Sequence, residues 1–128
     1  MNSKLRTPLA RVRGLGSARS GTEHFWRQRL TAVANIPLTI AFVLIVVSLL
    51  GRNHAAAQQI LGSPLVAIVI LLFIGSVTYH MRIGMQVVIE DYVHGEIARL
   101  SLVMLNTFFT VVVGLTAAYA IFKLSFGV

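Results

Sequence analysis

Two ionisable residues, His80 and Arg82, lie inside the second long apolar stretch of the chain. Ionisable groups are costly within a membrane, so each one indicates a function unless it has a simpler explanation. If the stretch is a helix ending near residue 89, His80 lies about 13–15 Å and Arg82 about 10 Å from that end. An imidazole at this depth suits axial ligation of haem iron or a hydrogen bond to a neighbouring helix. Arg82 can extend to the membrane surface or pair with a bound anionic group.

Small residues surround His80 at helical spacing. Gly84 follows it by one turn on the same face, and Gly75 and Ser76 lie about one turn before it. Such residues leave space for a large flat group, or they allow two helices to pack closely. Haem is the group that fits the first interpretation.

The face that carries His80 continues to a carboxylate. Positions 80, 84, 87 and 91 follow the spacing i, i+4, i+7, i+11, which aligns His80 with Asp91, and Tyr92 is adjacent. Asp91 lies about 16 Å from His80 along the helix axis. A tyrosine hydroxyl beside a carboxylate can donate a hydrogen bond to a carbonyl, and the carboxylate can orient it or relay a proton. The alternative is an ordinary interfacial tyrosine beside an aspartate that caps the helix.

Three transmembrane helices are predicted to position these residues. Residues 31–50 carry no charge, and twenty helical residues span a hydrocarbon core of about 30 Å. Pro64 suits the first turn of a second helix. The predicted helices are about 30–50, 64–89 and 98–123, joined by polar loops at 51–63 and 90–96. Residues 1–22 are predicted to be a flexible basic tail, and residues 23–128 a single three-helix transmembrane anchor domain.

Composition supports this all-α, integral membrane fold. The 128 residues are 56% hydrophobic and 12% charged, whereas a soluble domain has about a quarter of its residues charged. A soluble core of this size could not use so much apolar surface. The chain has no cysteine, so it holds no disulfide, no thiolate metal site and no iron–sulfur cluster.

The distribution of charge predicts the topology. The net charge is +7, and seven of the eleven basic residues precede residue 30, against Arg52 alone in the first loop. Basic segments stay on the cytoplasmic side, so the N-terminus and the loop at 90–96 are predicted to face the inside. The cationic tail then lies next to anionic lipid headgroups, and nucleic acid is not an expected partner.

The run from His80 to Tyr92, HMRIGMQVVIEDY, resembles the H-x-x-x-G-x-x-x-x-x-x-D-Y signature of the D-type membrane-anchor subunit of succinate dehydrogenase, respiratory complex II. The upstream run from His24 to Ala32, HFWRQRLTA, is similar to the segment before that family's first helix. The resemblance covers residues from about 24 to 125. It implies a non-dehydrogenase membrane subunit that contributes to electron transfer from succinate to quinone.

The resemblance also implies partners, cofactors and residue roles. His80 would be one axial ligand of haem b, shared with the cytochrome b subunit. Tyr92 would hydrogen-bond a ubiquinone carbonyl with Asp91 beside it, and Arg29 would lie near the haem propionates or the quinone. The flavoprotein and iron–sulfur subunits would dock on the inside and carry the FAD and the clusters. The resemblance carries no role over to Arg82 or His24, and some family members lack haem.

Two other functions fit the residues. A small ion channel or transporter subunit would line its path with His80 and Arg82, and an assembly factor would use them only as packing contacts. The predicted localisation is the bacterial inner membrane, with the mitochondrial inner membrane as the alternative.

Overall fold

The computed structural model describes residues 7–9 and 19–127. Within residues 19–127, four helices follow one another: α2 (Arg19–Leu49), α3 (His54–Leu61), α4 (Pro64–Tyr92) and α5 (Glu96–Phe126). Among the described residues there is no strand, and the predicted all-α fold is confirmed. α2, α4 and α5 are each long and apolar enough to cross a membrane.

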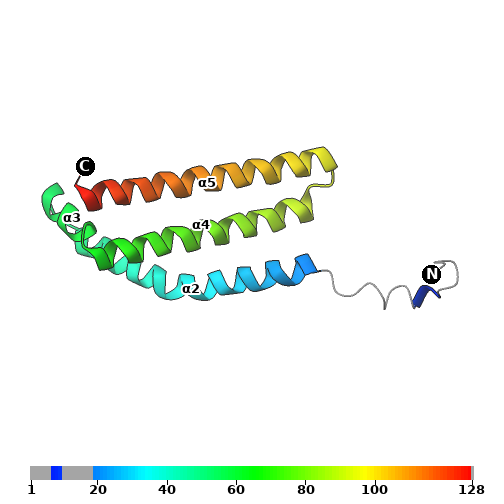
Figure 1. The fold of residues 1–128 in the computed structure, drawn as a ribbon, viewed down its shortest axis with the longest axis horizontal. Coiled ribbons are helices and arrows are strands. Elements are labelled where there is room, and N and C mark those ends of the chain that lie inside the picture. The colour runs from blue at the N-terminus through cyan, green and yellow to red at the C-terminus, as the bar shows by residue number, and fades with distance from the viewer. Residues whose placement is uncertain (1–6, 10–18, 128) are drawn as a thin grey trace.

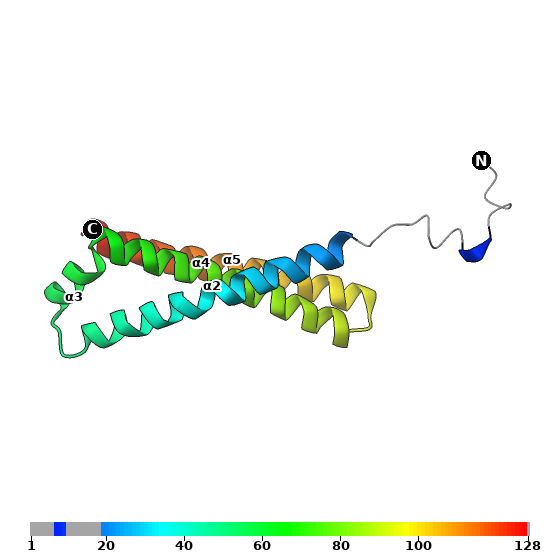
Figure 2. The same cartoon turned by 90° about the horizontal axis from the view of Figure 1, so that it is seen from below.

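The three long helices form a row with α4 in the middle (Figure 1). α4 packs against α2 on one side and α5 on the other, and α2 crosses α4 obliquely (Figure 2). A stacked pair of rings, Phe42 on α2 and Phe73 on α4, joins the two helices with ring centroids 4.4 Å apart. α2 bends in its middle part (Figure 1), where Pro37 removes a backbone hydrogen-bond donor.

Few side chains are buried within this row. Among the described residues the buried apolar ones are Ala67, Ile70, Ile83 and Ile89, all on α4. The long helices have 29 to 31 residues, or about 43–47 Å, which covers the hydrocarbon core and the headgroup layers. Many of their large apolar side chains are exposed, which suits contact with lipid.

Three predicted boundaries need correction. The first helix begins at Arg19 and not near residue 30, because a helix can continue beyond the hydrocarbon into the polar headgroup layer. It therefore includes the end of the predicted flexible tail, and residues 1–6 and 10–18 of that tail lie outside the described residues. The second helix continues to Tyr92 and the third begins at Glu96, which leaves a short connection at 93–95.

The first loop also differs from the prediction, because it contains the short helix α3. The Asn53 side chain caps α3 by accepting a hydrogen bond from the Ala56 N–H at 2.9 Å. Gly62 follows the last residue of α3. A Cβ at this position would lie 2.8 Å from the Gln58 carbonyl oxygen, so a larger residue would displace the backbone. α3 packs near the end of α5.

Different elements lie at the two ends of the row. The described start of α2 and the connection between α4 and α5 lie at one end, and α3 and the end of α5 lie at the other (Figure 1). The predicted convergence of the segment near Arg29 with the loop at 90–96 is thus confirmed. We call this the 93–95 end.

Candidate functional site

His80 faces α2 and contacts it through a hydrogen bond. Its Nδ1 lies 3.0 Å from Oγ1 of Thr31, a residue 49 positions earlier in the chain. The Thr31 hydroxyl is itself within 2.9 Å of the Arg27 carbonyl oxygen and 3.0 Å of the Gln28 carbonyl oxygen. Both side chains are half-buried. The imidazole is therefore fixed on one side by a neighbouring transmembrane helix.

The second ring nitrogen of His80 has no such partner. No hydrogen bond to Nε2 occurs among the described residues, and Nε2 is not one of their buried unpaired atoms, so it reaches the surface of the chain. No group of three or more His, Asp or Glu side chains converges on a metal position within residues 7–9 and 19–127. Haem iron needs only an axial imidazole from the protein on each side, because the porphyrin fills its other positions. His80 fits that requirement.

Gly84 packs against α2. A Cβ on Gly84 would lie 3.6 Å from Nε2 of Gln28, which is an ordinary contact distance. An alanine would therefore fit at Gly84 without moving α2 or α4, so this glycine does not set the distance between the two helices. Gly75, by contrast, borders open space, since a Cβ there would meet no atom within 4 Å.

Unsatisfied polar atoms flank the contact between Thr31 and His80. Gln28 Oε1 and Asn35 Oδ1 on α2, and Ser76 Oγ on α4, are buried without a hydrogen-bond partner. Buried polar groups are normally paired, so these three atoms are exceptions, and they lie on the helix faces that carry Thr31 and His80. The sequence reasoning missed these atoms and the contact with Thr31. Polar residues at 28, 31 and 35 mark one face of the helix, but they do not show which residue lies opposite.

A groove of about 520 Å³ opens between α2 and α4 near the 93–95 end. It is lined by His24, Phe25, Gln28, Arg29, Ile83, Val87 and Glu90. The Arg29 guanidinium carbon lies 4.5 Å above the centre of the Phe25 ring, a geometry that holds a cation through the ring electrons. The groove thus brings His24 and Arg29 together and offers both a cation and hydrogen-bonding groups to a ligand.

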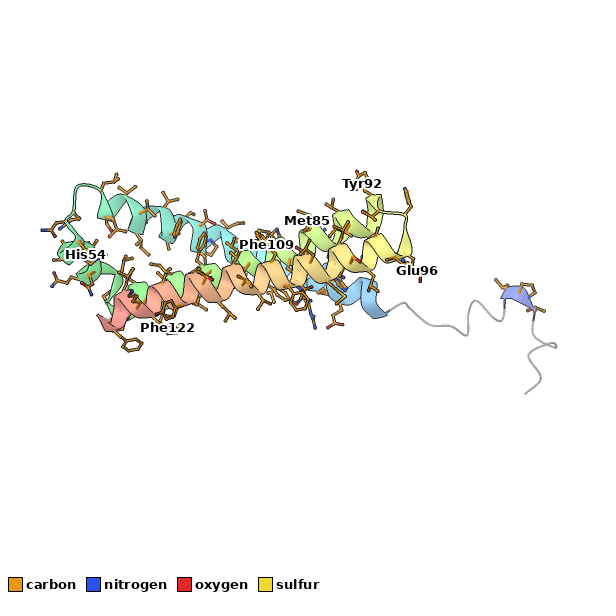
Figure 3. The ribbon with its side chains drawn as sticks, turned by 90° about the horizontal axis from the view of Figure 1, so that it is seen from above. His54, Met85, Tyr92, Glu96, Phe109 and Phe122 are labelled. Carbon is orange, nitrogen blue, oxygen red and sulfur yellow. The ribbon has the colours of Figure 1, made fainter. Side chains whose placement is uncertain are left out.

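Asp91 and Tyr92 form the last turn of α4, just beyond this groove, and neither lines it. Tyr92 is 78% exposed and lies at the same end as Glu96, far from His54 (Figure 3). No hydrogen bond within the described part of the chain engages the Tyr92 hydroxyl or the Asp91 carboxylate. Both groups are free to meet a ligand or another subunit.

Arg82 faces the other neighbour of α4. It lines a groove of about 340 Å³ between α4 and α5, together with Thr78 and Thr110. Its carbonyl oxygen accepts a hydrogen bond from the Asn106 amide at 3.0 Å, while its Nε is buried without a partner. Because His80 faces α2 and Arg82 faces α5, the two residues do not line a common path within this chain.

Comparisons with known proteins give one consistent result. Residues 3–120 match the family described as succinate dehydrogenase/fumarate reductase transmembrane subunit. A succinate dehydrogenase hydrophobic membrane anchor subunit of Paracoccus denitrificans is 31% identical over 94% of this chain and 93% of its own length. One of Rickettsia bellii is 30% identical over 95% and 98%. No solved structure gives a significant match.

A third relative, a succinate dehydrogenase membrane anchor subunit of Reclinomonas americana, is 35% identical over 64% of this chain and 71% of its own length. The first two relatives align over nearly their full length, and three helices able to span a membrane agree with the word anchor in their names. The chain therefore belongs to the family of succinate dehydrogenase/fumarate reductase transmembrane subunits, among the hydrophobic membrane anchors of succinate dehydrogenase.

Proposed function

We propose that this chain anchors a succinate:ubiquinone oxidoreductase in the bacterial inner membrane and contributes half of a haem b site and part of a quinone site. A cytochrome b subunit would complete the membrane part, and the flavoprotein and iron–sulfur subunits would dock at the 93–95 end. Membership of the family supports the anchor role. The seven basic residues before residue 30 support placing this end inside.

His80 would supply one axial imidazole to haem b. The observation that carries this assignment is a ring held through Nδ1 by α2, with Nε2 open at the surface of the chain. Haem b, when bound, takes up and releases single electrons. The row of three helices encloses no site by itself, so the second imidazole would come from the cytochrome b subunit.

The quinone would bind at the 93–95 end. The Tyr92 hydroxyl is exposed and can donate a hydrogen bond to a quinone carbonyl, and the adjacent Asp91 carboxylate can accept a hydrogen bond or a proton. Arg29, in the groove between α2 and α4, would place a positive charge near the haem propionates or the quinone oxygens. These groups lie where electrons from the docked dehydrogenase would arrive.

Purification of the complex through a tag on this chain tests the proposal. We expect the other three subunits to co-purify and the reduced-minus-oxidised spectrum to show haem b. His80→Leu should remove or alter that spectrum while the subunits still co-purify. His54→Leu, which changes an exposed histidine on α3 at the opposite end, is the matched control. An unchanged spectrum in His80→Leu would place the ligand elsewhere.

A further inference from the structure

The Thr31 hydroxyl makes three close polar contacts although it has one proton to donate. Oγ1 lies 2.9 Å and 3.0 Å from two carbonyl oxygens of its own helix and 3.0 Å from His80 Nδ1. A carbonyl oxygen can only accept, whereas a ring nitrogen donates or accepts according to its tautomer. If the Thr31 proton pointed at Nδ1, Oγ1 would face two carbonyl oxygens with no proton between them. All three contacts are satisfied when the hydroxyl donates to the carbonyls and Nδ1–H donates to Oγ1.

This arrangement fixes the tautomer of the ring. A neutral imidazole carries one proton, so a proton on Nδ1 leaves a lone pair on Nε2. We propose that Thr31 is a positioning residue that holds His80 in the tautomer and orientation in which Nε2 can bind haem iron. The inference rests on the proposed role of His80, and it assigns to α2 a part in a ligand site carried by α4.

The packing of the two helices makes Thr31 suited to this task. Its hydroxyl is tied to the preceding turn of α2, and its β-branched side chain has few rotamers in a helix. The Gln28 side chain lies beside Gly84 one turn away, so α2 and α4 are also in contact on that side of Thr31. The hydrogen-bond acceptor therefore keeps its position whether or not a haem is present.

A hydrogen bond from Nδ1–H makes the imidazole a stronger electron donor through Nε2. A stronger axial donor favours the ferric state, and hydrogen bonding around the ligand is one of the means by which a protein sets a haem potential. Loss of the Thr31 oxygen should therefore raise the midpoint potential of haem b and weaken its retention.

Two pairs of variants isolate the oxygen atom. The wild-type protein and Thr31→Val differ by a hydroxyl in place of a methyl group, and Thr31→Ser and Thr31→Ala differ by the same oxygen in a smaller side chain. Thr107→Val is the matched control, because the half-buried Thr107 hydroxyl bonds only to the Val103 carbonyl of its own helix at 3.0 Å. Each purified complex would be measured for haem per flavin, for the haem midpoint potential and for the ferric electron paramagnetic resonance spectrum.

We expect Thr31→Val and Thr31→Ala to raise the midpoint potential, to shift the ferric signal and to lower haem affinity by about 10- to 100-fold. Thr31→Ser and Thr107→Val should resemble the wild type. If Thr31→Val does not assemble, the comparison of Thr31→Ser with Thr31→Ala decides the question.

Two results would overturn the inference. One is a wild-type potential, spectrum and haem content in both variants that lack the oxygen. The other is equal behaviour of Thr31→Ser and Thr31→Ala, which would show that Thr31 acts by packing. The spectrum of His80→Leu distinguishes these results from a failure of the proposed function. If the proposed role of His80 is wrong, His80→Leu retains the haem spectrum. If only the Thr31 inference is wrong, His80→Leu still loses the haem spectrum.

Discussion

Replacing Tyr92 by Phe should slow quinone reduction without disturbing the rest of the complex. The side chain is 78% exposed, and its hydroxyl has no hydrogen bond within the described part of this chain, so its loss removes no contact that holds the helices together. One hydrogen bond to a neutral acceptor contributes about 0.5–1.5 kcal/mol, which corresponds to about a 2- to 13-fold loss of quinone affinity.

The assay compares two acceptors in the purified Tyr92→Phe complex. Succinate-dependent reduction of a ubiquinone analogue should fall, while reduction of an artificial acceptor that takes electrons before the membrane should be spared. Tyr119→Phe is the matched control, since Tyr119 is also exposed, at 67%, and belongs to α5 away from the 93–95 end. If both activities fall together, Tyr92 holds the dehydrogenase on the membrane. If neither changes, Tyr92 is an interfacial anchor and the quinone assignment is wrong.

Three further predictions concern topology and packing. The chain has no cysteine, so His54→Cys and His94→Cys each introduce a single labelling site. Position 54 should label from the outside and position 94 from the inside. Labelling of position 54 from the cytoplasm would show that the predicted topology is wrong. Asn106→Leu removes the hydrogen bond to the Arg82 carbonyl. The unfolding free energy of the complex should fall by about 0.6 kcal/mol, and by about 1.7 kcal/mol at most. An unchanged thermal midpoint would contradict this prediction. Arg82→Leu should lower the thermal midpoint more than Arg82→Lys, because the terminal guanidinium nitrogens, which are not among the buried unpaired atoms, can meet an acceptor from outside the chain. A higher midpoint in Arg82→Leu would show that no such acceptor exists.

The long helices could be predicted because the hydrocarbon core imposes a length and excludes charge. The same reasoning misplaced the start of α2, since Arg27 and Arg29 can continue a helix outside the hydrocarbon. It also missed α3, where eight residues are too few for a transmembrane signal. The Asn53 cap was the remaining clue, and a single cap residue also occurs in ordinary turns.

The contact between Thr31 and His80 could not be predicted from the sequence. A pairing across 49 residues depends on the crossing angle and register of α2 on α4. Contacts such as the Phe42–Phe73 stack hold that register. Such a contact does not follow from the pattern within one helix, which gives a face but not the residue opposite it.

The polar groups that could bind a ligand or a cofactor are the ones that lack a full set of partners within this chain. His80 is satisfied at Nδ1 but open at Nε2, Gln28 keeps a buried acceptor without a donor, and the Tyr92 hydroxyl has no partner in the described chain. Only the Gln28 oxygen among these groups is buried, where an unpaired polar atom costs about 1–3 kcal/mol. The Tyr92 hydroxyl and the His80 Nε2 lie at the surface of the chain, so leaving them unpaired costs the isolated chain little. Under the proposed function, these two groups would gain their partners only when the cofactor, the quinone and the other subunits assemble around this anchor.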